Sequence, residues 1–171
     1  MSLLKDLVCA LLLLVIAYQD FKYRAVWWFL FPALAVAFLF PGLPAHFPLP
    51  IEEIAFNLGF IFSQLILLWF YVSIKQRSFV NIVNTHIGMG DILFLVAICF
   101  AFSIVNLLFF YITGLLLVLS SVIMVKFITG KEVKHVPLAG GLAVVLAGWL
   151  IAKNILFLDF FKDPLLNNFL R

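Results

Sequence analysis

The sequence predicts an all-α polytopic membrane protein with six transmembrane helices, and three observations carry this prediction. Hydrophobic residues make up 66% of the 171 residues and charged residues only 11%, whereas a soluble domain is about 45–50% apolar and about 25% charged. The charged residues gather in segments that separate long apolar runs. Lys and Arg are divided unequally between alternate segments. Residues 1–171 are therefore interpreted as one membrane-embedded domain.

Six apolar runs follow one another along the chain. We interpret the first run as a retained helix and not as a signal peptide, because the second run begins within a few residues of it. Residues 103–106 form the least polar of the predicted breaks, and residues 155–171 form an interfacial C-terminal tail. Gly140, Gly141 and Gly148 in the last run permit close helix packing. The runs cover residues 3–18, 26–40, 54–74, 91–102, 107–127 and 137–152.

The basic residues predict the orientation of the helices. Seven of them lie in the connections after the first, third and fifth runs or at the adjoining helix ends, and the two short loops on the other side contain none. Because Lys and Arg are retained on the cytoplasmic side, we expect a multi-pass protein of the inner (cytoplasmic) membrane with both termini outside the cytoplasm. The seven residues are Lys22, Arg24, Lys75, Arg77, Lys126, Lys131 and Lys134.

The eight acidic residues can be sorted by their position relative to the membrane. Glu132 lies between lysines in a loop, where an ion pair contributes little. Asp20 ends the first run and Asp91 opens the fourth, so both are expected at one membrane depth on the cytoplasmic side. A helix bundle could bring them together. The other five are expected to be solvated: Asp6, Glu52, Glu53, Asp159 and Asp163.

Two carboxylates that share a site can carry out aspartic proteolysis. Mutual repulsion raises the pKa of one group, which stays protonated as an acid while the other, ionised, activates water. Gly88 and Gly90 stand just before Asp91 and predict irregular backbone that would let an extended substrate strand approach. A simpler alternative stays open, in which Asp91 only caps the fourth helix and Asp20 is an interfacial acid balanced by the basic residues after it.

The segment Gly88-Met89-Gly90-Asp91 resembles the G-x-G-D signature of intramembrane aspartyl proteases. Its combination with Asp20 at the end of a first helix resembles the type IV prepilin peptidases. Pro137-Leu138-Ala139-Gly140-Gly141 is similar to the Pro-containing start of that family's last catalytic helix. The resemblance covers residues 1–153 and implies a G-x-G-D protease-like bundle with Asp20 and Asp91 as the catalytic pair. The residues expected to support the pair or the approach of substrate are Gly88, Gly90, Lys22, Arg24 and Pro137.

The resemblance also implies a substrate. It indicates cleavage of a pilin-like precursor protein, with a short basic leader and a hydrophobic helix, at the cytoplasmic membrane face, with no metal, cofactor or nucleic acid involved. The methyltransferase region of larger members has no counterpart in the sequence, which implies a peptidase-only form. Two positions depart from the family pattern: Val26-Trp27 replaces the usual Ile-Pro, and Leu93 stands where Lys is common.

Two other classes of protein stay open. A small ion- or proton-coupled transporter could relay ions through the same two acids, and a structural membrane subunit would need Asp91 only as a helix cap. The separation of the two carboxylates distinguishes these classes, because a catalytic pair must share a bridging water. The sequence does not decide whether His86 or His135 contributes. Cys9 and Cys99 are expected to be buried structural thiols.

Overall fold

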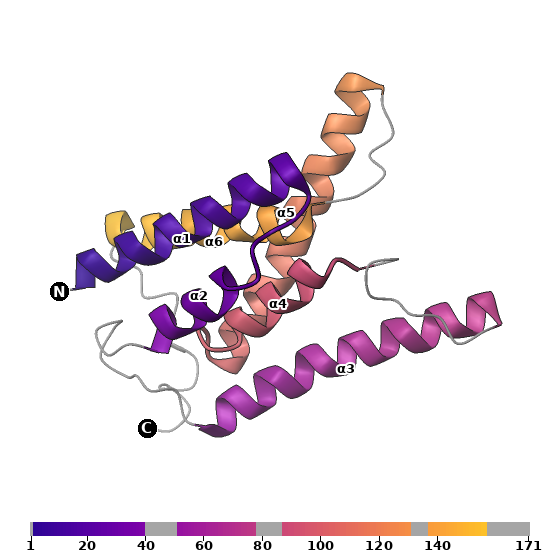
Figure 1. Ribbon diagram of the computed structural model, residues 1–171, viewed down its shortest axis with the longest axis horizontal. Helices are drawn as coiled ribbons and strands as arrows, with labels where there is room; N and C mark the ends of the chain where they lie inside the picture. The colour runs from indigo at the N-terminus through magenta and orange to yellow at the C-terminus, as the bar shows by residue number, and fades with distance from the viewer. Residues whose placement is uncertain (1, 40–50, 78–86, 131–136, 157–171) are drawn as a thin grey trace.

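The computed structural model describes residues 2–39, 51–77, 87–130 and 137–156. In these residues the chain forms six helices and no strand, so the all-α prediction is confirmed for this part of the sequence. The helices follow the order of the predicted apolar runs (Figure 1). They are α1 (Ser2–Tyr23), α2 (Leu30–Leu39), α3 (Ile51–Gln76), α4 (Met89–Ile98), α5 (Ile104–Thr129) and α6 (Leu138–Leu156).

Two of the described helices are long and apolar enough to cross a membrane. They are α3, over 26 residues, and α5, over the 25 residues Ile104–Ile128. Only 11% and 17% of their most apolar segments are buried inside the protein, whereas the core helix of a soluble domain would be mostly buried. By contrast, α2 and α4 have 10 residues each, about half of what a membrane span needs.

The break between α4 and α5 comes earlier than the sequence predicts. Cys99, Phe100 and Ala101 each donate their backbone N–H to the carbonyl three residues before them, which tightens the end of α4 into a turn of 3₁₀ type. The helix therefore ends at Ile98, and α5 begins after Ser103. The chain turns at residues 99–103, most of which belong to the predicted fourth run (91–102). The break therefore lies a few residues before the predicted one at 103–106.

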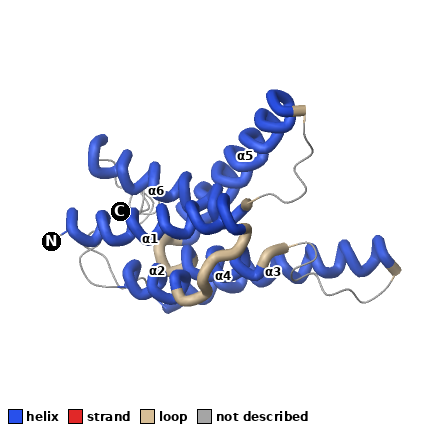
Figure 2. Tube along the Cα trace, turned by 45° about the horizontal axis from the view of Figure 1, so that its top comes forward, coloured by secondary structure: helices blue, strands red, loops and turns tan. Residues whose placement is uncertain are grey.

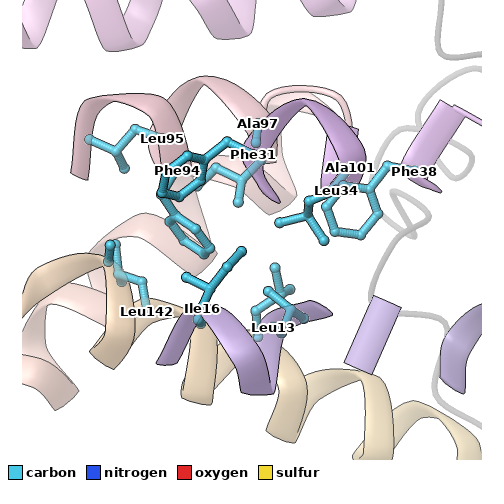
Figure 3. Close-up of a cluster of buried hydrophobic side chains, with 14 of the residues drawn as sticks. Leu13, Ile16, Phe31, Leu34, Phe38, Phe94, Leu95, Ala97, Ala101 and Leu142 are labelled. Carbon is cyan, nitrogen blue, oxygen red and sulfur yellow. The ribbon is translucent and has the colours of Figure 1, made fainter. Parts of the chain in front are cut away.

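The core lies among α1, α2, α4 and α6. The longest packed contact is between α1 and α6, which lie side by side in both views (Figures 1 and 2). Side chains from all four helices meet in one apolar cluster (Figure 3). Its fully buried members include Leu13, Ile16, Leu34, Phe94 and Leu142. Burying each such side chain contributes about 1.5–3 kcal/mol, so this cluster holds the four helices together.

A buried amide ties α3 to the turn between α4 and α5. Asn57 is only 1% exposed, and its Nδ2 donates to the carbonyls of Cys99 at 3.1 Å and Phe102 at 2.7 Å. Carbonyls at the end of a helix have no partner within the helix, so Asn57 satisfies groups that the early end of α4 leaves open. This contact anchors a helix that otherwise buries little of its surface.

Helices α5 and α6 cross closely at two glycines. A Cβ atom on Gly114 would lie 2.6 Å from Leu142 Cδ2, and one on Gly141 would lie 2.6 Å from Val118 Cγ2. The predicted close packing is therefore confirmed at Gly141. It was wrong at Gly148, where a Cβ atom would meet nothing within 4 Å of the described chain.

Helices α1, α3 and α5 end toward the same side of the molecule, although α3 and α5 diverge from one another (Figure 1). The C-terminal ends of α1, α3 and α5 and the N-terminal ends of α4 and α6 all lie toward the right of the view in Figure 1. Lys22, Lys75 and Lys126 are in the last turns of α1, α3 and α5. Asp20 and Asp91 belong to the same end of the bundle.

Candidate active site

The site is built on the N-terminus of α6. The Gly141 N–H donates to the Pro137 carbonyl at 3.0 Å, which makes Pro137 the N-cap residue of α6. An N-cap side chain usually accepts a hydrogen bond from the free N–H groups of the first turn. Proline has no side-chain oxygen, so the N–H groups of Ala139 and Gly140 must find acceptors elsewhere.

The two aspartates singled out in the sequence supply these acceptors. The Ala139 N–H donates to Asp91 Oδ1 at 2.7 Å, and the Gly140 N–H donates to Asp20 Oδ2 at 2.6 Å. Because the donors are consecutive amides, the two acceptor oxygens lie no more than roughly 8 Å apart. The structure thus brings together, at one helix end, carboxylates from α1 and α4.

Asp91 also caps α4, although not from the position that the sequence suggests. Gly88 is the N-cap residue and Asp91 is the third residue of the helix. Asp91 Oδ2 accepts the Gly88 N–H at 3.2 Å, as the third residue does in a capping box, although Gly88 has no side chain to complete that motif. The Asp91 N–H bonds to the Gly88 carbonyl at 3.1 Å in the first backbone turn of the helix. The carboxylate of Asp91 therefore joins the positive N-terminal ends of two helices.

The electrostatics of the pair favour retention of a proton. Asp20 is 9% exposed and Asp91 is half-buried; both lie outside α3 and α5, the two helices long enough to cross a membrane. Burial raises the pKa of both carboxyls, and the charge of Asp20 raises the pKa of Asp91 further. The N–H bonds from α6 and the charge of Arg24 lower these pKa values only in part. A like charge nearby is one of the causes that raise the pKa of a carboxyl in a carboxylate pair.

The glycines before Asp91 do not have the backbone that we expected. Gly90 lies inside α4, so the prediction of irregular backbone was wrong there. Gly88 lies just outside the helix in an extended conformation, with φ −67° and ψ 142°, which any residue can adopt. Gly88 leaves room for the carboxylate instead, because a Cβ atom there would lie 3.0 Å from Asp91 Oδ2. At Gly90 a Cβ atom would meet Phe31 and Val26 only at ordinary contact distances.

The two basic residues expected to support the site differ in their placement. The Lys22 amine donates to the Tyr18 hydroxyl at 2.6 Å and lies over the rings of Tyr18 and Tyr23, so it is engaged on the surface of α1. Arg24 acts on the site, since its charge favours the ionised form of Asp20. Its own N–H donates to the Asp20 carbonyl at 3.1 Å and ends α1.

Two contacts at the site were not predicted from the sequence. Gln19 Oε1 accepts the Trp27 N–H at 3.0 Å and so holds the chain as it turns from α1 toward α2. The N–H groups of Ala139 and Gly140 were also missed as donors. A proline N-cap followed by small residues was the available signal, because it leaves first-turn donors without a local acceptor.

The remaining sequence predictions have mixed outcomes. Cys9 and Cys99 are free and buried, as expected. Asp6 is 4% exposed, so the prediction of a solvated side chain was wrong there. In the described ranges, no group of three or more His, Cys, Asp or Glu side chains could hold a metal ion. Five of the acidic and histidine residues discussed above lie outside the described residues: His86, Glu132, His135, Asp159 and Asp163.

No family model matches the sequence, and neither does any curated protein or solved structure. The likeness to intramembrane aspartyl proteases accordingly stands on the motifs in the sequence and on the geometry around Asp20 and Asp91.

Proposed function

We propose that the protein is an intramembrane aspartic endopeptidase of the prepilin peptidase type, with Asp20 and Asp91 as its catalytic pair. The observation that carries the proposal is the convergence of both carboxylates on two consecutive N–H groups of α6. Capping a helix needs only one short polar side chain from its own N-cap residue. Burying two carboxyl groups from two other helices costs more free energy than a local N-cap side chain would. This cost favours a catalytic role for the two aspartates over a capping role alone.

The chemistry follows from the pairing. One carboxyl is protonated and the other is ionised, and the ionised group takes a proton from a water held between them. The resulting hydroxide attacks the scissile carbonyl carbon while the protonated carboxyl gives its proton to the carbonyl oxygen. Collapse of the tetrahedral intermediate breaks the C–N bond, and the amine leaves with the proton taken from the water. One hydroxyl proton of the intermediate returns to the carboxylate that had protonated the carbonyl oxygen, which restores the pair. The N–H groups of Ala139 and Gly140 hold the two carboxylates in place against their mutual repulsion.

The proposed setting is the inner membrane, crossed by α3 and α5 and with the shorter helices embedded beside them, so that the aspartate pair lies at the cytoplasmic face. The apolar lengths of α3 and α5 support the membrane placement. Lys22, Lys75 and Lys126 support the orientation, since they lie at the end of the bundle that holds the aspartates and basic residues mark the cytoplasmic side. The proposed substrate is a pilin-like precursor with a basic leader and a hydrophobic helix.

Substitution by asparagine separates catalysis from capping. Asp20→Asn and Asp91→Asn each keep an oxygen that accepts the N–H of α6, but the side chain can no longer exchange a proton. We expect each variant to insert and fold normally and to lose cleavage of a pilin-like precursor by about 10²–10⁴-fold, the range for loss of general acid–base catalysis. The measurement is the gel shift of precursor incubated with membranes that contain each variant.

Thr113→Val is the control, because the Thr113 hydroxyl bonds to carbonyls of its own helix; it should cleave like the wild type. Cleavage that survives both asparagine substitutions would sink the proposal. If the wild type cleaves nothing but carries protons across vesicles, and Asp20→Asn stops that flux, the two acids belong to a transporter.

A further inference from the structure

A groove opens between α3 and α5, at the end of these helices away from the aspartate pair. Its volume is about 630 Å³, within the range of about 300–1,000 Å³ for small-molecule sites. The N-terminal halves of both helices line it, mainly with apolar or small side chains. These include Ala55, Phe56, Gly59, Phe60, Leu107 and Leu108.

The surroundings of the groove are apolar as well. Its two walls belong to the helices that are long and apolar enough to cross a membrane, so in a bilayer it opens toward the hydrocarbon. Gly59 lies in its wall, and a Cβ atom there would meet nothing within 4 Å. The described chain therefore leaves this part of the groove open, and a flexible hydrocarbon chain could fill it.

The groove is lined by three residues with polar side chains besides its apolar wall, Asn57, Ser63 and Glu52, and the Asn57 Oδ1 atom is buried without a hydrogen-bond partner. The Ser63 hydroxyl donates to the Phe60 carbonyl at 2.7 Å, and the Asn57 amide holds the turn after α4. Glu52, exposed in the first turn of α3, is the charged residue among those that line the groove, and no Lys, Arg or His stands with it in the described wall.

We propose that this groove binds one membrane lipid, with an acyl chain along α3 and α5 and a primary ammonium head group on Glu52. An anionic head group would be repelled by Glu52, and a quaternary ammonium has no N–H to donate. A primary ammonium offers three donors to the carboxylate, in charge-assisted hydrogen bonds. The inference rests on the membrane placement of α3 and α5 and not on the peptidase activity.

The test is competition among lipids, read by native mass spectrometry of the full-length protein. The protein is mixed with equimolar phosphatidylethanolamine, phosphatidylcholine and phosphatidylglycerol that carry the same acyl chains. We expect the wild type to retain one phosphatidylethanolamine in preference to the other two lipids. Gly59→Leu places a side chain in the groove, and the retained fraction should fall about tenfold or more as contacts with the chain are lost.

Gly148→Leu is the matched control, because a Cβ atom there also meets nothing within 4 Å but lies on α6, away from the groove; it should retain lipid like the wild type. Glu52→Gln keeps the shape of the groove and removes its charge. It should reduce the preference for phosphatidylethanolamine over phosphatidylglycerol about two- to fivefold, the size of an exposed ion pair.

Equal retention of the three lipids, or retention unchanged in Gly59→Leu, would overturn the proposal. So would a complex of two chains that Gly59→Leu abolishes, because the groove would then belong to a second copy. Loss of precursor cleavage in the aspartate variants with lipid retention intact bears on the proposed peptidase alone, so the two proposals fail separately.

Discussion

The four helices α1, α2, α4 and α6 and the two helices α3 and α5 differ in what holds them in place. Along α6, Leu142, Ala143 and Leu146 are all fully buried, whereas α3 buries only Asn57, Ile61 and Val72 of its 26 residues. The C-terminal halves of α3 and α5 extend away from the other helices (Figures 1 and 2). Packing within the described chain therefore covers the first group, whereas most of α3 and much of α5 beyond its contact with α6 stay uncovered.

This difference explains where the aspartate pair lies. A carboxylate pair must be held to a fraction of an ångström to act together, so it needs rigid support. Asp20 and Asp91 are carried by the well-packed helices α1 and α4 and are held by α6. The groove, by contrast, lies between α3 and α5, the two helices that bury less of their surface.

The largest expected difference is in stability. Leu142→Ala opens a cavity where α6 meets the other helices, because Leu142 is fully buried, and it should lower the free energy of unfolding by about 2–5 kcal/mol. Leu116→Ala makes the same change at a side chain on α5 that is 61% exposed, and it should stay within about 0.5 kcal/mol of the wild type. Denaturant unfolding of the purified protein in detergent measures both. Equal losses would mean that the two regions are not packed differently.

The next effect is on the proposed catalysis. A Cβ atom on Gly140 would lie 2.9 Å from Asp20 Oδ2 and 3.0 Å from Asp20 Cβ, so Gly140→Ala must displace the whole side chain of Asp20. We expect precursor cleavage to slow roughly 100-fold, as for an ångström-scale misplacement of a reacting group. Gly148→Ala is the same substitution on the same helix in open space, and its cleavage rate should be unchanged. If both variants cleave at the same rate, the close contact with Asp20 has no catalytic role.

A smaller effect is expected where the two regions are joined. Asn57→Ala removes the donor to the Cys99 and Phe102 carbonyls and leaves buried acceptors unsatisfied, so it should cost about 1–3 kcal/mol of stability. Ser63→Ala removes a hydroxyl that bonds to a carbonyl of α3 itself and should cost less than about 0.5 kcal/mol. Unfolding curves compare them, and a neutral Asn57→Ala would show that this amide does not anchor α3.

The smallest effect is a dependence of stability on pH. The folded-state pKa values of Asp20 and Asp91 are raised above 3.8, so the folded protein binds protons more tightly than the unfolded chain. This contribution to stability is complete below the unfolded pKa and is lost as pH rises through the folded pKa values. The melting temperature of the wild type should therefore rise as pH is lowered through the folded pKa values toward the unfolded value. Asp20→Asn should show a weaker dependence, and an identical pH profile would contradict the raised pKa of Asp20.

Some features of the fold could be predicted from the sequence because they depend on local patterns. The apolar runs predict the helices in order, and a proline next to small residues marks the start of α6. The early end of α4 could not be predicted, because the carbonyls that it leaves free are bonded by a residue far away in the sequence. Asn57 donates to them from 42 and 45 positions away. The close fit at Gly141 and the open space at Gly148 could not be told apart either, since both are glycines in one apolar run.

For the site, the sequence by itself determined which acids to pair, because Asp20 ends the first apolar run and Asp91 opens the fourth, on the side that the basic residues predict to be cytoplasmic. Only the tertiary structure decided how they meet. The Gly140 N–H and Asp20 are 120 positions apart, and the Ala139 N–H and Asp91 are 48 positions apart. Their hydrogen bonds exist because the packing of α1 and α4 against α6 brings both carboxylates to amides that Pro137 leaves without a local acceptor, and no local pattern encodes that packing.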